Sequence, residues 1–132
     1  MEIRYALVKE LPDMDYDHAV ERTTELLAEE GFGVLTEIDV KATLKKKLDL
    51  DFKRYVILGA CNPKLAHQAL TGEPLLGVLL PCNMVVMERD GGGVIVAAFK
   101  PTAGFSLVDN PDVMPIADQV EGKMRRVLDG LG

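Results

Sequence analysis

Residues 55–63 read Y-V-I-L-G-A-C-N-P, and residues 73–86 read E-P-L-L-G-V-L-L-P-C-N-M-V-V. Each segment contains an apolar run beside a Cys-Asn pair, Cys61-Asn62 in the first and Cys82-Asn83 in the second. Residues 56–58 are Val, Ile and Leu, without polar alternation. Such a run is typical of a central strand that is covered on both faces. We therefore expect this strand near the middle of a sheet.

The first segment continues into a predicted helix. Asn is a strong N-cap because its side-chain oxygen accepts a bond from a free amide of the first turn. Pro fits the next position because its missing N–H loses no hydrogen bond there. Asn62-Pro63 thus predicts a helix start, and Gly72 its end. The apolar residues 73–80 are predicted to form a short turn that is buried or lies at a subunit contact.

The remaining elements follow from the spacing of apolar residues, which is two in strands and three or four in helices. We expect strands at residues 3–9, 33–40, 52–60, 82–88 and 94–99, a loop at 100–111, and helices from Asp13 or Asp15 to about 30, at 42–48, at 63–72 and from 110–115 onward. The glycine-rich residues 89–93 predict a hairpin. The order β-α-β-α-β-α-(α)-β-β-α favours an α+β fold, one domain over residues 1–132, with a mixed or antiparallel five-stranded sheet and helices packed on it. A parallel doubly wound sheet is the alternative.

The composition argues against several classes of protein. The net charge of −6 argues against a nucleic-acid binder, which needs a basic face against phosphates. No apolar run approaches the ~20 residues of a membrane span. Residues 1–4 do not begin a signal peptide, so we expect a cytoplasmic protein with no membrane partner. Many charged residues and few amides are typical of a thermophilic source.

The two cysteines are candidate catalytic residues. Cys61 directly precedes the predicted helix start, where free N–H groups and the helix dipole favour a thiolate. It is therefore a candidate nucleophile, redox thiol or sulfur carrier. Cys82 could resolve an oxidised Cys61 if the two strand ends are neighbours. The alternative for each is a small buried apolar residue, since free cysteine is among the most buried residue types.

Five polar residues are candidate ligand-binding residues. Asn is disfavoured within a strand, so Asn83 needs a polar partner, which is either a ligand or the backbone of a neighbouring loop. Asn62 lies at a strand-to-helix junction, where it could contact an anion. Glu37 and Asp39 project from one side of their strand and, with Lys41, could form an acid/base or ion-pair cluster. A solvent-facing strand with salt bridges is the alternative.

A metal site is not expected, and no cofactor is assigned. Structural zinc needs three or four ligands in a regular spacing. Cys61 and His67 lie six residues apart, which matches no common zinc spacing.

The chain resembles domain-of-unknown-function family three hundred and two over nearly its whole length. The matching stretches are E-I-D-V-K at residues 37–41, G-A-C-N-P at 59–63 and, most specifically, L-L-P-C-N at 79–83. The resemblance implies a compact α+β fold and a dimer, but it implies no reaction. It draws more attention to Cys82-Asn83 than to Cys61 alone.

Three functional hypotheses follow. The leading one is a homodimer that binds a small ligand or partner in a groove beside Cys82-Asn83, with an apolar wall formed by Leu75, Leu76, Val78, Leu79 and Leu80. The second is a thiol redox or sulfur-carrier protein that uses Cys61, Cys82 or both. The third is an assembly module without a site, in which residues 75–80 form the dimer interface.

Overall fold

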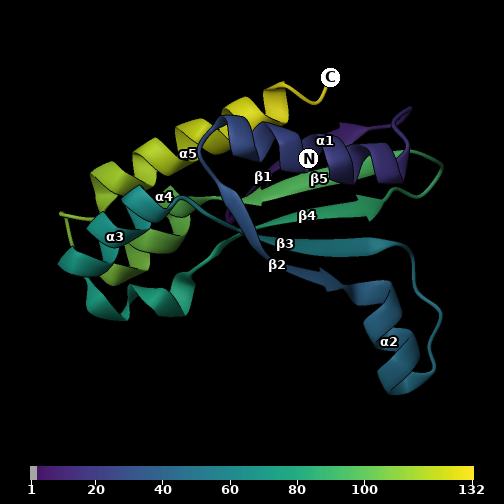
Figure 1. The fold of residues 1–132 in the computed structure, drawn as a ribbon, viewed down its shortest axis with the longest axis horizontal. Helices are drawn as coiled ribbons and strands as arrows, with labels where there is room; N and C mark the ends of the chain where they lie inside the picture. Colours follow the sequence, from purple (N-terminus) through teal and green to yellow (C-terminus); the bar gives the residue numbers. More distant parts are fainter. Residues whose placement is uncertain (1–2) are drawn as a thin grey trace.

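Five strands build one sheet in the order β1-β5-β4-β3-β2, and every pair of neighbours is antiparallel. The computed structural model describes residues 3–132 (Figure 1). The strands are β1 (Ala6–Leu11), β2 (Gly33–Asp39), β3 (Tyr55–Cys61), β4 (Cys82–Glu88) and β5 (Val94–Phe99). The predicted α+β fold is confirmed, with the antiparallel form of the sheet.

The helices lie in the predicted order between these strands. They are α1 (Tyr16–Glu29), α2 (Val40–Leu48), α3 (Pro63–Gly72) and α5 (Met114–Asp129), with the short turns η1 (Pro74–Leu79), α4 (Pro101–Gly104) and η2 (Phe105–Val108). The carboxylate of Asp15 accepts a bond from the His18 amide at 3.1 Å and caps α1. Gly31 has a positive φ of 84°, which lets the chain reverse after α1.

The predicted loop at residues 100–111 is wrong in part, because α4 and η2 lie within it. The cause is tertiary. The Glu121 carboxylate of α5 accepts a bond from the Thr102 amide at 3.2 Å and another from its hydroxyl at 2.6 Å. The first amides of a short helix lack partners within the helix, and a carboxylate from elsewhere in the chain can accept a bond from them. No pattern within residues 100–111 predicts this acceptor.

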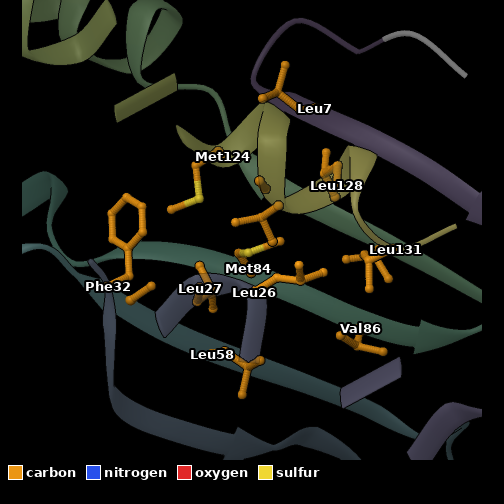
Figure 2. Close-up of a cluster of buried hydrophobic side chains, with 14 of the residues drawn as sticks. Leu7, Leu26, Leu27, Phe32, Leu58, Met84, Val86, Met124, Leu128 and Leu131 are labelled. Atoms are coloured by element: carbon orange, nitrogen blue, oxygen red, sulfur yellow. The ribbon is translucent and has the colours of Figure 1, made fainter. Parts of the chain in front are cut away.

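One face of the sheet packs against α1 and α5 and forms the main core (Figure 2). Leu58 of β3, Met84 and Val86 of β4, Leu27 of α1 and Met124 of α5 belong to this cluster, and all five are fully buried. Each such side chain contributes roughly 1.5–3 kcal/mol by leaving water. This core fixes the positions of the strand ends that carry the Cys-Asn pairs.

The second face of the sheet is open within residues 3–132, so the expectation that β3 is covered on both faces is wrong for the single chain. The strand registers place a row of apolar side chains straight across this face: Val8, Ala97, Val85, Ile57 and Ile38, one from each strand. Four of the five are half-buried, and Ile38, at the β2 edge, is 46% exposed. An antiparallel sheet can leave one face to water, but that face is then ordinarily polar. We call the side of the sheet that carries this row the open face.

Helix α2 projects away from the body of the molecule (Figure 1). Leu44 and Leu48 are spaced four residues apart, as the anchors of a packed helix would be, but α2 has no buried residue and Leu48 is 62% exposed. It is held at its start, where Asp39 Oδ1 accepts a bond from the Ala42 amide at 2.9 Å. Helix α2 is therefore anchored mainly at its N-terminal end, and its side chains are not packed in the core.

No helix in the described part of the chain is both long and apolar enough to cross a membrane.

Candidate functional site

The two Cys-Asn motifs lie against each other in the middle of the sheet. Strands β3 and β4 pair so that Ala60 lies opposite Cys82 and Gly59 opposite Asn83. A Cβ atom on Gly59 would overlap the Thr36 hydroxyl and would lie 2.9 Å from Cγ of Pro81. The missing side chain at Gly59 thus makes room for the Pro81 ring, and the G-A-C-N-P and L-L-P-C-N segments pack as one unit.

Cys61 and Cys82 line one small cavity at the end of the sheet, between β3, β4 and α3. Its volume is about 40 Å³, and its other lining residues are almost all apolar, among them Phe32, Leu65 and Phe105. Such a space holds a few water molecules and is far too small for a cofactor. Both cysteines are free thiols. The hypothesis of a resolving Cys82 required that the two strand ends be neighbours, and the pairing of Ala60 with Cys82 meets that condition.

The Cys82 thiol in this cavity has low reactivity. Burial, and secondarily the nearby Cys61, raise the pKa of the Cys82 thiol to about 12. A thiolate is the reactive form of cysteine, so Cys82 is a poor nucleophile at neutral pH. Cys61 is half-buried and is the more accessible of the two.

Asn62 also lines the cavity, but its side chain has a structural task. Its Oδ1 accepts a bond from the Leu65 amide at 3.2 Å and caps α3, as the sequence predicts. This bond occupies the amide oxygen, which would otherwise be available to a ligand.

Asn83 lies on the other side of the sheet from Cys82, because successive residues of a strand point to opposite faces. It is exposed and lines a hollow of about 380 Å³ on the open face, together with Tyr5, Tyr55 and Val85. Sequence reasoning missed these three residues. The signal was available, since the outward positions of β3, β4 and β5 are apolar as well as the inward ones.

Glu37, Asp39 and Lys41 lie at a third place. The two carboxylates line a shallow depression beside Tyr16 of α1. Asp39 caps α2, and Lys41 Nζ donates a bond to the Phe52 carbonyl at 2.8 Å, so both serve the local fold. Burial, followed by the charge of Asp39, raises the pKa of Tyr16. The candidate residues therefore do not converge on one site.

The apolar segment 75–80 is not a single wall. Leu80 lines the cysteine cavity, and Leu76 is 2% exposed and belongs to a second core cluster with Phe105. Leu75 and Val78 are 80% and 86% exposed and lie outside both the cavity and the open-face hollow. Leu76 therefore belongs to the interior and is unavailable for an interface.

Within residues 3–132, no group of three or more His, Cys, Asp and Glu side chains is arranged to hold a metal ion.

Comparisons with known proteins agree with the fold. The family model described as "Domain of unknown function DUF302" matches residues 7–131. A solved structure, the crystal structure of an uncharacterized conserved DUF302 protein from Bacillus stearothermophilus, superimposes with a TM-score of 0.87. The two sequences are 32% identical, and the match covers 95% of this chain and 96% of that one. No curated protein matches the chain. The sequence, the fold and the motifs at residues 59–63 and 79–83 together place the chain in the DUF302 family.

Proposed function

We propose that this protein is a homodimeric binding protein, in which two copies cover each other's open face and a small, mostly apolar ligand lies in the hollow beside Asn83. The observation that carries the proposal is the apolar row that crosses all five strands on the uncovered side of the sheet.

The size of this face supports a partner. Five strands spaced about 4.8 Å apart, each roughly 20 Å long, span a face on the order of 400 Å². The largest apolar patch on a typical monomer covers roughly 300–600 Å² and is often functional, so a face of this size is a candidate contact surface. The central row contains no charged residue.

A second copy of the chain suits this surface better than an unrelated partner. Sheets pack face to face at about 10 Å when their inner side chains interdigitate, and Val, Ile and Ala side chains suit that packing. The α2 helix gives independent support. It has nine residues, no buried side chain and an exposed Leu48. Helices of this length are marginal without tertiary packing, and a partner beside the β2 edge would provide it.

The hollow defines the chemistry of the ligand. Its lining is apolar except for the Asn83 amide and the hydroxyl groups of Tyr5 and Tyr55. An amide offers two donors and an acceptor, and a phenol offers one of each. The ligand that fits is a small apolar molecule with at least one hydrogen-bonding group, which Asn83 orients.

Size-exclusion chromatography with light scattering tests the dimer. The wild-type chain of 14.4 kDa is expected to elute at twice this mass. Val85→Asp buries a charge at the centre of the paired faces and should give a folded monomer. Val78→Asp is the matched control, because Val78 is 86% exposed on η1, outside the open face. Ile38→Lys, at the exposed edge of the row, covers the case in which Val85→Asp fails to fold. A wild-type monomer, or a Val78→Asp monomer, contradicts the proposal.

A thermal-shift screen against small aromatic and aliphatic amides, alcohols and acids tests the ligand. A compound that binds the hollow should raise the melting temperature of the wild type and not that of Asn83→Ala. Because Asn83 is exposed, the ligand-free variant should melt close to the wild type. If the protein is dimeric and no compound shifts it, the third hypothesis, an assembly module without a site, takes precedence.

A thiol function is the second candidate, because both cysteines line one cavity. Mass spectrometry after brief alkylation at neutral pH decides it. Fast labelling of Cys61 in the folded chain would support a reactive thiol, and slow labelling of both cysteines would remove this candidate.

A further inference from the structure

Three basic residues from distant parts of the chain line one concavity between the β1 edge and α5. Lys9 comes from β1, Lys100 follows β5, and Arg125 lies on α5. The concavity has a volume of about 350 Å³, and Asp129 is the one acid among its lining residues. The chain as a whole has a net charge of −6, so a concavity lined by three cations and one acid differs from the rest of the molecule.

Two of the three cations are held in place by the fold. Lys9 Nζ donates a bond to the Leu128 carbonyl at 2.9 Å, near the C-terminal end of α5. Arg125 Nη2 donates a bond to Glu121 Oε2 at 3.2 Å. An ammonium has three donors and a guanidinium five, so both groups keep free N–H bonds for another acceptor.

Glu121 does not cancel the charge of the concavity. It is 9% exposed, and its other oxygen, Oε1, accepts the two bonds from Thr102 that hold α4. Burial alone would raise the pKa of Glu121, but the hydrogen bonds from Thr102 and Arg125 lower it below the ordinary value, so the carboxylate stays charged. Even with Glu121 counted beside Asp129, the cations remain in excess. Glu121 acts as a positioning residue, because its hydrogen bond with Arg125 holds the guanidinium in place.

We propose that this concavity binds a phosphate group, as the free ion or as part of a small phosphorylated metabolite. One guanidinium and two ammonium groups that line the same concavity suit a tetrahedral oxyanion, since Arg binds its oxygens in pairs and Lys adds a point charge. The apolar side chains of Ile3 and Leu128 also line the space and would contact the carbon atoms of an ester. A nucleic acid does not fit, because it needs a row of cations along an extended face.

The site shares Ile3, Ala6 and Val8 with the open-face hollow, but none of its three cations lines that hollow, so the phosphate titration and the dimer tests depend on different groups. Its failure would leave the proposed function untouched, and the converse also holds.

Isothermal titration calorimetry of the full chain with inorganic phosphate, at low and constant ionic strength, tests the site. Saturable binding at one site per chain is expected. Lys100→Gln and Arg125→Gln should each weaken it by about ten-fold, which corresponds to the loss of one charge-assisted hydrogen bond. Arg126→Gln is the matched control. It changes the next residue of α5, whose guanidinium donates a bond to Glu30, the residue after α1, at 2.9 Å, and this variant should bind phosphate as the wild type does.

A parallel titration with glycerol 1-phosphate separates the two sources of phosphate. Tighter binding of the ester would assign a phosphorylated metabolite, and equal or weaker binding would assign the free ion. Absence of saturable binding for both compounds overturns the proposal. So does an equal loss of affinity in Arg126→Gln and Arg125→Gln, since that result would mean a diffuse charge effect. Circular dichroism of each variant confirms that it is folded.

Discussion

A single methyl group added at Gly59 tests whether the two Cys-Asn motifs pack as one unit. The Cβ of Gly59→Ala would overlap the Thr36 hydroxyl and lie 2.9 Å from Cγ of Pro81. Thr36 is exposed, so its hydroxyl can rotate away at small cost. The Pro81 ring cannot rotate, so either the ring or the strand must shift. The perturbation is therefore an overpacking at the contact between β3 and the segment that leads into β4.

Overpacking of this kind destabilises proteins by about 1–3 kcal/mol. Unfolding entropy of about 2.1 cal/mol/K per residue, over the 132 residues of the chain, converts this into a melting temperature lower by roughly 4–11 °C. Differential scanning calorimetry at one fixed protein concentration measures the shift, since dimerisation would make it depend on concentration.

Gly33→Ala is the control for Gly59→Ala. Gly33 lies on β2 opposite Cys61, and a Cβ there would have no atom within 4 Å. This variant should melt at or slightly above the wild-type temperature, because alanine restricts the unfolded chain. The double variant Gly59→Ala/Thr36→Ala should recover only the part of the loss that the hydroxyl causes. If Gly59→Ala melts like Gly33→Ala, the motifs do not pack as described.

Three further predictions concern burial and titration. Below pH 9 the protonated Cys82 thiol stabilises the folded chain, and this contribution should be lost as the pH rises from 9 toward 12, so urea unfolding should show a decline in that window that Cys82→Ala lacks. The lowered pKa of Glu121 makes a stability contribution that is present above pH 4.5 and lost as the pH falls through the lowered value; Glu121→Gln should flatten this acid dependence in the same assay. Leu76→Ala should lower the unfolding free energy by about 2–5 kcal/mol and its exposed neighbour Leu75→Ala by less than about 0.5 kcal/mol, and similar losses in both would refute the burial of Leu76.

The parts of the fold that depend on local chemistry were predictable. Asp15 and Asn62 cap their helices because the acceptor and the amide lie three residues apart in the sequence. The hairpin between β4 and β5 follows from its three glycines, all of which have positive φ values. In each case the decisive contact lies within a few residues, so the sequence pattern contains it.

The open face could not be predicted in the same way. A Val-Ile-Leu run such as residues 56–58 looks the same whether its second side meets helices, a partner or water. The strand order is likewise a matter of long-range pairing. The separation of Cys82 from Asn83 is different, since it follows from the two-residue period of a strand and was open to inference. The convergence of Lys9, Lys100 and Arg125 depends on tertiary structure alone.

The pairing of β1 with β5 affects the order in which the sheet can form during synthesis. Strands β2, β3 and β4 each pair with the next strand along the chain, whereas β1 pairs with β5, so Ala6 lies opposite Phe99. At synthesis rates of about 5–20 residues per second, roughly 5–20 seconds pass between the synthesis of Ala6 and that of its partner Phe99. Helix α5, whose Leu128 carbonyl accepts the bond from Lys9, is synthesised later still. Leu7 and Leu11 are buried in the folded chain, and during that interval the strand and helix that bury them have not yet been made. Among the five strands, β1 is thus synthesised before the others and paired after them, and we expect a chaperone that shields β1 to act before the rest of the sheet forms.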